Sequence, residues 1–268
     1  MKVVLFCGGR GTRIREYAEN VPKPLIPLGA QPIMRHVMQY YASYGHEDFV
    51  LCLGYKANVI KDFFINARPE TYADCVISSP GRIEMLGGPP KDWRIALIDT
   101  GIWRNIGERL WAVRDQVRNE GIFLANYSDG LTDVDLDDMI RVFRESDKLA
   151  CFLAVRPPLT YHLADIEPDG RVREFRSSET SDMWINGGYF LMRNEIFDYM
   201  REGEELVLEP FARLIAEDKL MAYKHEGFWR SMDTMRDWQT LEAMVERGDM
   251  PWISRGSDVK LASPVHLP

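Results

Sequence analysis

Short apolar runs alternate with amphipathic segments through the first half of the chain. Runs of about four to six apolar residues favour buried strands, and apolar side chains at helical spacing favour helices. Strands are predicted at residues 2–7, 49–53, 75–78, 95–98, 122–125 and 150–155. Helices are predicted from Pro32 and at 59–64, 106–117 and 135–143. This alternation predicts an α/β fold, with a Rossmann-like, mostly parallel mixed sheet flanked by helices.

The pattern changes after Arg156-Pro157-Pro158. Pro168-Asp169-Gly170 predicts the turn of a β-hairpin. Further strands are predicted at 184–192 and 220–223, and helices at 195–200, at 209–217 and from Asp233 onward. We therefore expect smaller β-rich additions in the C-terminal half. No repeat or low-complexity tract divides the chain, so we predict one domain over 1–268, with halves at 1–155 and 156–268.

Composition and charge exclude several classes of function. The formal net charge is −8 and no Lys or Arg block occurs, which argues against a nucleic-acid partner. No apolar stretch approaches the roughly 18 residues of a membrane span, and the N-terminal run is too short for a signal peptide. We expect no membrane partner and a cytoplasmic location. The four cysteines lack metal-binding spacing and are expected to be reduced core residues.

A glycine-rich loop follows the first predicted strand, Gly8-Gly9-Arg10-Gly11-Thr12-Arg13. It matches neither the P-loop nor the dinucleotide-binding pattern. A turn with few side chains lets backbone N–H groups approach phosphate oxygens, and Arg13 adds a charge-assisted contact. An ordinary glycine turn with a surface arginine is an equally good interpretation of the glycines alone.

Three charged residues are candidates for chemistry. Lys23 is flanked by two prolines, which hold its backbone extended. Asp129 follows a predicted strand and could hold Mg²⁺ against a triphosphate. Asp233 lies at the start of the last predicted helix. Each has a simpler interpretation: a solvated loop lysine, a turn aspartate and the N-cap of the last helix.

A fourth acidic segment, Asp133-Val134-Asp135, matches the metal motif of many glycosyltransferases. We interpret it instead as acidic residues at a helix N-terminus.

Taken together, these segments resemble the sugar-phosphate nucleotidyltransferases. The glycine-rich loop is similar to the family's GGxGTR loop, and Lys23-Pro24 to the lysine-proline after it. Tyr127-Ser128-Asp129-Gly130 resembles the metal-binding aspartate loop, and 185–188 (Ile-Asn-Gly-Gly) the sugar-binding strand. Residues 227–234 resemble the second metal segment. Segments 52–56, 97–101 and 228–234, with Pro251-Trp252, are most similar to the branch that joins CTP to glucose 1-phosphate.

The resemblance implies a GT-A-like fold, with a nucleotide-binding half at 1–155 and a half for acceptor binding and assembly at 156–268. It implies Mg²⁺-dependent joining of a nucleoside triphosphate to a sugar 1-phosphate with release of pyrophosphate. A homo-oligomer is also implied. The implied catalytic residues are Arg13 and Lys23, and the implied metal ligands are Asp129 and Asp233. The implied binding residues are Gly8, Gly9, Gly11, Thr12, Arg13, Arg109 and Asp129 for the nucleotide, and Tyr127, Asn186, Gly187 and Arg176 for the acceptor.

Two positions depart from the family pattern. The family carries Glu-Lys-Pro shortly before the Asn-Gly-Gly strand, and its lysine binds the sugar phosphate. Residues 175–180 here place a serine at the lysine position. Either Arg176, Arg173 or Arg156 substitutes for it, or the acceptor differs, or activity is weak. The branch's nucleotide-binding Gly-Gly-Arg is altered to Gly107-Glu108-Arg109.

These departures leave the substrates open. The acceptor could be a modified sugar, a cyclitol phosphate or a phosphonate, and UTP, dTTP or GTP could replace CTP. The residues around 81–84 bear on the choice of base. Two different functions also stay open: a catalytically silent nucleotide-sensing subunit, and a glycosyltransferase that uses Asp133-Val134-Asp135 for its metal.

Overall fold

The structure is a computed structural model that describes residues 1–11, 14, 21–66, 75–78, 82–85, 93–157, 162–177 and 183–253. Thr12 and Arg13 lie outside these residues. Arg176 and Ser177 are described by their backbone alone.

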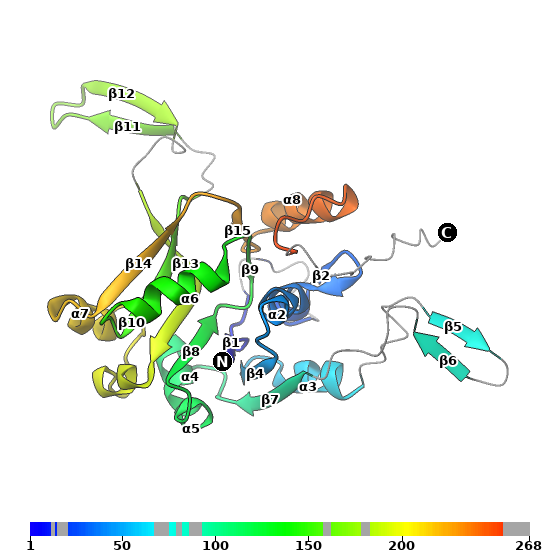
Figure 1. Ribbon diagram of the computed structural model, residues 1–268. Helices are drawn as coiled ribbons and strands as arrows, with labels where there is room; N and C mark the ends of the chain where they lie inside the picture. Colours follow the sequence, from blue (N-terminus) through cyan, green and yellow to red (C-terminus); the bar gives the residue numbers. More distant parts are fainter. Residues whose placement is uncertain are drawn as a thin grey trace.

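A sheet of seven strands forms the centre of the described chain, in the order β14-β10-β13-β8-β1-β4-β7 (Figure 1). β13 runs antiparallel to β8 and β10, and the other neighbouring pairs are parallel. The predicted mostly parallel, mixed sheet is therefore confirmed. Its strands are β1 (Lys2–Phe6), β4 (Asp48–Leu53), β7 (Arg94–Asp99), β8 (Ile122–Asn126), β10 (Ala150–Val155), β13 (Ile185–Arg193) and β14 (Leu220–His225).

The strand order reverses direction next to β1. After β1 the chain adds β4 and β7 on one side, and it then returns to place β8 on the other side of β1. Ligands of open α/β sheets bind at the carboxyl ends of the strands where the order reverses in this way. The loops after β1 and β8 both lie at this point.

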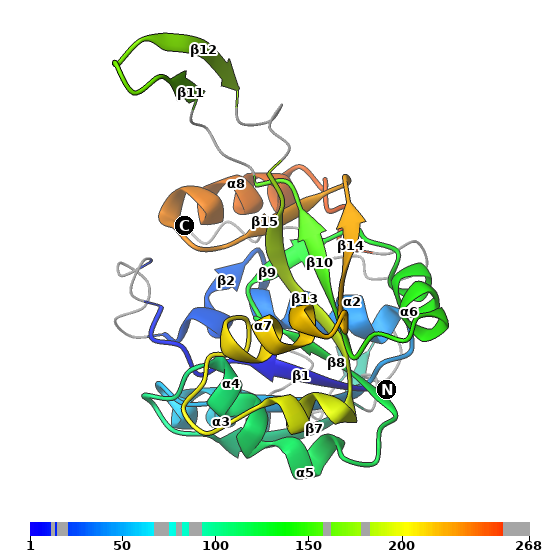
Figure 2. The same cartoon turned by 90° about the vertical axis from the view of Figure 1, so that its left-hand side faces the viewer.

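Strand alternation produces two cores, one on each face of the sheet. Val3 and Leu5 belong to one buried cluster, and Val4 and Phe6 to the other, because successive side chains point to opposite faces. Figure 2 shows the face covered by α4, α5 and α7. The first face packs on α2 (Ile33–Ser43), α3 (Ala57–Ile65) and α6 (Leu136–Glu145); the second on α4 (Ile106–Ala112), α5 (Arg114–Val117), the 3₁₀ helix η5 (Asn194–Tyr199) and α7 (Glu209–Ala216).

One local prediction was wrong, and one predicted strand is confirmed but pairs outside the main sheet. The predicted helix at 106–117 is broken at Val113, whose φ of −105° and ψ of 9° are not helical, so α4 and α5 are separate. The predicted strand at 75–78 does not join the main sheet: β5 (Cys75–Ser78) pairs with β6 (Arg82–Met85) in a hairpin. Apolar patterning predicts a strand but not its partner.

The β-rich addition to the C-terminal half is a second hairpin. β11 (His162–Ile166) pairs antiparallel with β12 (Val172–Ser177), and Gly170 in the turn has a φ of +87°. The predicted hairpin is thus confirmed, and it projects away from the main sheet (Figures 1 and 2). Its exposed side chains include Ile166, Val172 and Phe175.

The C-terminal part of the described chain returns to the N-terminal half. β15 (Trp229–Ser231) pairs with β9 (Gly130–Thr132), and the Trp238 indole of α8 (Met235–Glu246) donates to the Pro27 carbonyl at 2.8 Å. Pro27 belongs to the small β2 (Pro27–Leu28) and β3 (Gln31–Pro32) pair, which follows the 3₁₀ helix η2 (Lys23–Leu25).

Helix α8 begins with a capping box made by Thr234 and Asp237. Asp233 is therefore not its N-cap, and that interpretation of Asp233 was wrong.

No helix among the described residues has the length and apolar character that a bilayer crossing requires. Cys7, Cys52 and Cys151 are buried and carry no disulfide, as predicted for core cysteines. Burial raises the pKa of Cys7 and of Cys151 to about 12, so both stay neutral thiols. The side chain of Cys75 lies outside the described part of the chain.

Candidate active site

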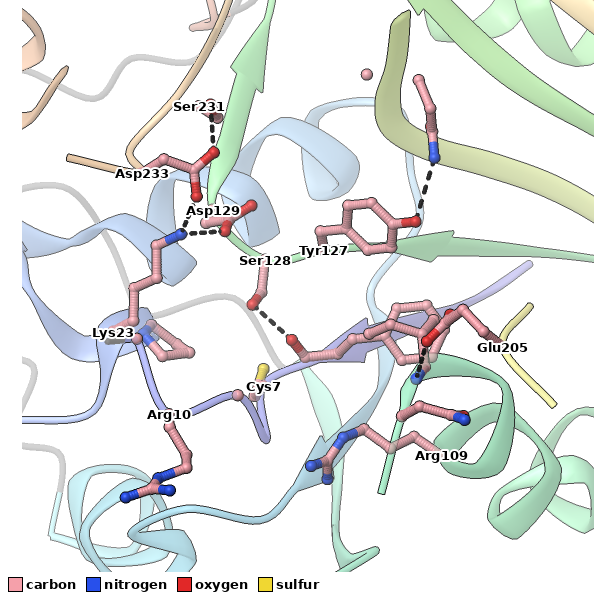
Figure 3. A pocket seen from close by; sticks show the side chains of 18 of the residues that line it. Cys7, Arg10, Lys23, Arg109, Tyr127, Ser128, Asp129, Glu205, Ser231 and Asp233 are labelled. Atoms are coloured by element: carbon pink, nitrogen blue, oxygen red, sulfur yellow. Dashed lines mark hydrogen bonds and ion pairs between the residues drawn. The ribbon is translucent and has the colours of Figure 1, made fainter. Parts of the chain in front are cut away.

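A cavity of about 780 Å³ opens where the loops after β1 and β8 meet (Figure 3). This volume is typical of a site for a small-molecule ligand. The structure brings most of the predicted site residues into its lining: Gly9, Gly11, Lys23, Arg109, Tyr127, Asp129, Asn186, Gly187 and Asp233. Gly8 lies directly against Arg109, one of these lining residues. Thr12, Arg13 and the side chain of Arg176 are outside the described residues, so their predicted roles stay predictions.

The centre of the cavity holds one cation between two carboxylates. Lys23 Nζ lies 2.5 Å from Asp129 Oδ2 and 2.8 Å from Asp233 Oδ1. The three side chains are 13%, 21% and 27% exposed, so the cluster is largely shielded from water. The Ser231 hydroxyl donates to the second oxygen of Asp233 at 3.0 Å and fixes its orientation.

Short strand pairing brings the two aspartates together, although 104 positions separate Asp129 from Asp233 (233 − 129). β9 follows Asp129 and β15 precedes Asp233, and Gly130 faces Ser231 in their antiparallel ladder. The N–H of Met232 donates to the carbonyl of Asp129 at 2.9 Å. The ladder therefore sets the spacing of the carboxylates.

Proline residues hold Lys23 opposite this pair. Pro22 is the N-cap of η2, Pro24 lies within it, and the N–H of Leu25 donates to the Pro22 carbonyl at 2.8 Å. Burial alone would lower the pKa of Lys23, but the charges of Asp129 and Asp233 outweigh it and raise this pKa. Lys23 is therefore positively charged at neutral pH.

The same geometry can be compared with the needs of a divalent cation. Magnesium prefers one or two carboxylates, with phosphate oxygens and water completing its shell. Asp129 and Asp233 both already contact the Lys23 ammonium, so one cation can reach both carboxylates at once. Among the described residues, no group of three acidic, His or Cys side chains could form an all-protein metal site. The donor set fits a metal that a substrate phosphate helps to hold.

Arg109 lines the cavity beside the loop after β1. It is 2% exposed and directs its guanidinium N–H groups to neutral oxygens rather than to a carboxylate. These acceptors are Gly8 O (3.1 Å), Leu53 O (3.1 Å), Thr100 Oγ1 (2.7 Å), Gly101 O (2.8 Å) and Ile102 O (3.3 Å). Arg109 thus joins the loops at the carboxyl ends of β1, β4 and β7.

This contact explains the first glycine of the loop. A Cβ at Gly8 would lie 2.0 Å from Arg109 Nη1, so a larger residue cannot be accommodated without moving the arginine. The predicted nucleotide contact of Arg109 stays a prediction, whereas its support of the loop is a feature of the structure.

Asn186 and Tyr127 line the opposite end of the cavity. The Asn186 amide donates to the Tyr127 hydroxyl at 3.1 Å and accepts from the N–H of Gly188 at 2.9 Å. Gly188 has a φ of +77°, and a Cβ there would lie 2.7 Å from the Tyr127 ring. The indole N–H of Trp229 donates to the Gly187 carbonyl at 2.8 Å. Asn186 is therefore held in one orientation at the cavity wall.

Ser128 adopts a backbone conformation that is unusual for a residue with a side chain. Its φ is +66°, in the left-handed region that normally favours glycine. Its N–H donates to Asn126 Oδ1 at 2.6 Å, and its hydroxyl donates to the Phe6 carbonyl at 3.0 Å. These bonds tie the loop after β8 to β1 and direct the next residue, Asp129, into the cavity.

Sequence reasoning missed several lining residues, among them Ser128, Glu205, Trp229 and Ser231. Glu205 comes from an irregular segment before α7, where no local pattern marks a site. Burial raises its pKa. Ser128, Trp229 and Ser231 lie inside segments that carry the family resemblance, but the resemblance implies no role for them.

The glycosyltransferase-like acidic segment does not line the cavity. Asp135 is the N-cap of α6 and accepts from the N–H of Asp138 at 3.1 Å. Asp133 Oδ1 lies 2.7 Å from His225 Nε2. The interpretation of this segment as acidic residues at a helix N-terminus is confirmed.

Comparison with known proteins identifies the class to which this fold and cavity belong. The family model described as nucleotidyl transferase matches residues 2–246, so the chain belongs to that family. A Bacillus anthracis protein whose structure was solved with sucrose has the same fold, with a TM-score of 0.67 at 16% identity. The match covers 91% of this chain and 94% of that one.

Within the family, the chain is similar to glucose-1-phosphate cytidylyltransferases. That of Salmonella typhi is 35% identical over 254 residues, which cover 94% of this chain and 98% of the relative. That of Salmonella typhimurium has the same identity and coverage. The predicted resemblance is confirmed.

Proposed function

We propose that the protein joins CTP to glucose 1-phosphate and releases pyrophosphate, forming CDP-glucose. The choice of substrates is supported by the 35% identity to the Salmonella enzymes over 94% of the chain. The observation that carries the reaction type is the Lys23 ammonium between Asp129 and Asp233 in the cavity (Figure 3). Such a cluster can place cationic charge against phosphates.

The reaction needs no protein nucleophile. An oxygen of the sugar phosphate attacks the α-phosphorus of the triphosphate, and the bond to the departing pyrophosphate breaks. Because both reactants are anions, catalysis consists of bringing them together and stabilising the charge that moves to the leaving group. Lys23 and Arg13 are the proposed catalytic cations, and the amides of Gly8, Gly9 and Gly11 are the proposed phosphate donors.

The proposal includes Mg²⁺, held by Asp129 and Asp233 together with the triphosphate. The metal would supply charge neutralisation at the phosphates. For Asp129 and Asp233 to hold the metal, the Lys23 ammonium would have to leave at least one of the two carboxylates. The flexible lysine side chain can then turn toward the α-phosphate, which is the role proposed for it.

Asn186 and Gly187 are the proposed contacts of the sugar, since Asn186 is oriented by Tyr127 and Gly188. Arg176 and Thr12 complete the proposed substrate contacts, and Arg109 supports the nucleotide-binding loop through its hydrogen bonds to the loop carbonyls. A cytoplasmic location and self-association belong to the same proposal. The exposed apolar side chains of the β11–β12 hairpin support self-association, which sedimentation velocity would test.

Two alternatives keep specific support. The serine at the family's lysine position favours a different phosphorylated acceptor. The segment around 81–84, which bears on base choice, is only partly described, so UTP, dTTP and GTP stay rivals of CTP.

The deciding experiment is pyrophosphate release from ATP, CTP, GTP, UTP and dTTP, each with glucose 1-phosphate, in Mg²⁺ and then in EDTA. We expect release with CTP and none in EDTA. Release with another triphosphate would contradict the proposed base. If no pyrophosphate is released with any of the five triphosphates, or with a panel of different phosphorylated acceptors, while nucleotide binding is measurable, the sensing subunit is favoured.

A further inference from the structure

The acceptor end of the main sheet carries a cluster of two cations on one indole ring. Arg156 Cζ lies 4.8 Å from the centre of the Trp184 ring, and Lys224 Nζ lies 5.2 Å from the same ring. Arg156 immediately follows β10, Trp184 immediately precedes β13, and Lys224 belongs to β14. Three strands thus deliver one basic-aromatic cluster to the carboxyl-end edge of the sheet.

The ladder shows how close this cluster is to the cavity. Asn186 faces Ala154 in the β13–β10 pair, and Ala154 faces Lys224 in the β10–β14 pair. Neighbouring strands are about 4.8 Å apart, so the backbone of Lys224 lies roughly 10 Å from that of the cavity residue Asn186. Pro157 and Ile185, the chain neighbours of Arg156 and Trp184, line the cavity themselves.

Lys224 and Asn186 also share a face of the sheet. Met221 and Tyr223 pack in the core that contains α2 and α6, so Lys224 points to the opposite face. Tyr127, the partner of Asn186, packs with Phe190 on that opposite face.

Helix α7 covers only the start of this face. Its Phe211 packs against Phe152 and Phe190, and Arg156 lies four positions beyond Phe152, about 13 Å further along the strand. Figure 2 shows β10 and β14 continuing past α7.

The cations of this cluster are accessible to a ligand. The Arg156 side chain is 35% exposed, and Lys224 is exposed. Contact with a ring face holds each cation through its charge. One carboxylate balances the cluster in part: Glu226 lies 3.7 Å from Arg156 and is itself 73% exposed.

The geometry points to an anion-binding subsite made by Arg156, Trp184 and Lys224, which binds a second anionic group of the acceptor. It rests on the proposed function, because the reactive phosphate of that acceptor is the one proposed to react beside Lys23. The acceptor would be a sugar 1-phosphate with a carboxylate or a second phosphate on the side of the sugar remote from the reaction. This assignment goes beyond glucose 1-phosphate, which has no such group.

The test compares acceptors that differ only in this second group. Glucose 1-phosphate, glucose 1,6-bisphosphate and glucuronic acid 1-phosphate are each turned over with CTP, and KM and kcat are measured separately. We expect at least one of the two acceptors with a second anionic group to have a KM about tenfold below that of glucose 1-phosphate, because a charge-assisted contact is worth about this factor. The better of the two identifies the anion as phosphate or carboxylate.

Variants then assign the effect to the cluster. Arg156→Gln and Lys224→Met should each raise the KM of the preferred acceptor about tenfold, leave kcat nearly unchanged and leave the KM of glucose 1-phosphate within about twofold. Glu226→Gln should lower the KM of the preferred acceptor. Lys219→Met is the matched control, since Lys219 precedes the opposite end of β14 and pairs with Asp147; it should change neither KM.

Two results would overturn the subsite. Wild-type enzyme could show no preference for an acceptor with a second anion, or both KM values could rise equally in Lys224→Met, which would place the reactive phosphate at the cluster. Absence of pyrophosphate release with every acceptor is a failure of the proposed function instead. In that case calorimetric binding of glucose 1,6-bisphosphate to wild-type protein, Lys224→Met and Lys219→Met decides the subsite: weakening by Lys224→Met alone supports it, and equal binding by all three contradicts it.

Discussion

The two edges of the central sheet each place an arginine at the carboxyl ends of their strands, and the two side chains are used differently. Arg109, at the β1–β4–β7 edge, is 2% exposed and bonded to oxygens of three loops. Arg156, at the β13–β10–β14 edge, is 35% exposed and lies against an indole ring. Both residues are arginines, but Arg109 reaches the strand ends from helix α4 whereas Arg156 directly follows β10, and their surroundings differ.

Arg109 therefore stabilises the site, whereas Arg156 is placed where it can contact a ligand. The N–H groups of Arg109 are committed to carbonyl oxygens, so its main effect is to hold the glycine-rich loop in place. Arg156 is held by a ring face, and its exposure allows it to contact a solute. A basic residue beside the cavity therefore has to be judged by its exposure as well as by its charge.

The largest expected effect lies between the two edges, at Asp129. Asp129→Asn removes one carboxylate from the Lys23 cluster, and we expect kcat for pyrophosphate release to fall by about 10³-fold. Asp133→Asn is the matched control, because Asp133 is acidic, nearby in sequence and absent from the cavity lining. Comparable losses in both variants would contradict the placement of the reaction at Asp129.

Lys23 should give the next largest effect. Lys23→Met should lower kcat by about 10²-fold, since a positioned cation is lost from the charge-stabilising set. The same change leaves Asp129 and Asp233 without their ammonium partner. Mn²⁺ should therefore bind the nucleotide-free variant more tightly than wild-type protein, as measured by calorimetry. Weaker Mn²⁺ binding would show that the carboxylates do not hold the metal.

The two arginines give the direct test of the comparison. Arg109→Met leaves several buried loop carbonyls without a donor and should lower the free energy of unfolding by about 3 kcal/mol, measured by urea denaturation. Arg156→Met should change it by less than about 0.5 kcal/mol, as is usual for an exposed residue. Equal losses of stability in the two variants would remove the distinction between the edges.

The smallest expected effect is at Ser128. Ser128→Gly relieves the strain of a φ of +66° but loses the hydroxyl bond to the Phe6 carbonyl. The relief of strain and the loss of the hydrogen bond oppose each other and are each about 1 kcal/mol, so the free energy of unfolding should change by less than that amount. Ser128→Ala keeps the strain and loses the bond, and should be about 1 kcal/mol less stable than wild-type protein. If the alanine variant matched wild type, the hydroxyl bond would not position this loop.

Local patterning predicted each strand of the main sheet but little of its pairing. The reversed direction of β13 and the separate β5–β6 hairpin depend on partners far along the chain, which an apolar run does not specify. Val113 broke a helix whose apolar spacing was continuous, because the chain there turns to cover the sheet.

The candidate site, like the strand pairing, could be predicted only in part from local sequence patterns. Lys23 could be singled out from its flanking prolines, but its two carboxylate partners could be joined to it only through the family resemblance. The backbone ladder that unites Asp129 with Asp233 leaves no local trace in the sequence. The hydrogen-bond partners of Arg109 could not be predicted from the sequence either, since any residue type can supply a backbone carbonyl.

The return of the C-terminal part onto the first half has a consequence for synthesis on the ribosome. Asp233 and the strand that positions it appear only after more than four-fifths of the chain has been made. Three contacts then join this part to residues near the start: Trp238 to Pro27, Glu242 to the N–H of Gly29, and Trp252 to His36. A nascent or truncated chain that ends before residue 229 can form much of the sheet, yet it lacks half of the carboxylate pair. Unfinished copies of the protein are therefore expected to be chemically inert, although a large part of the fold is already present.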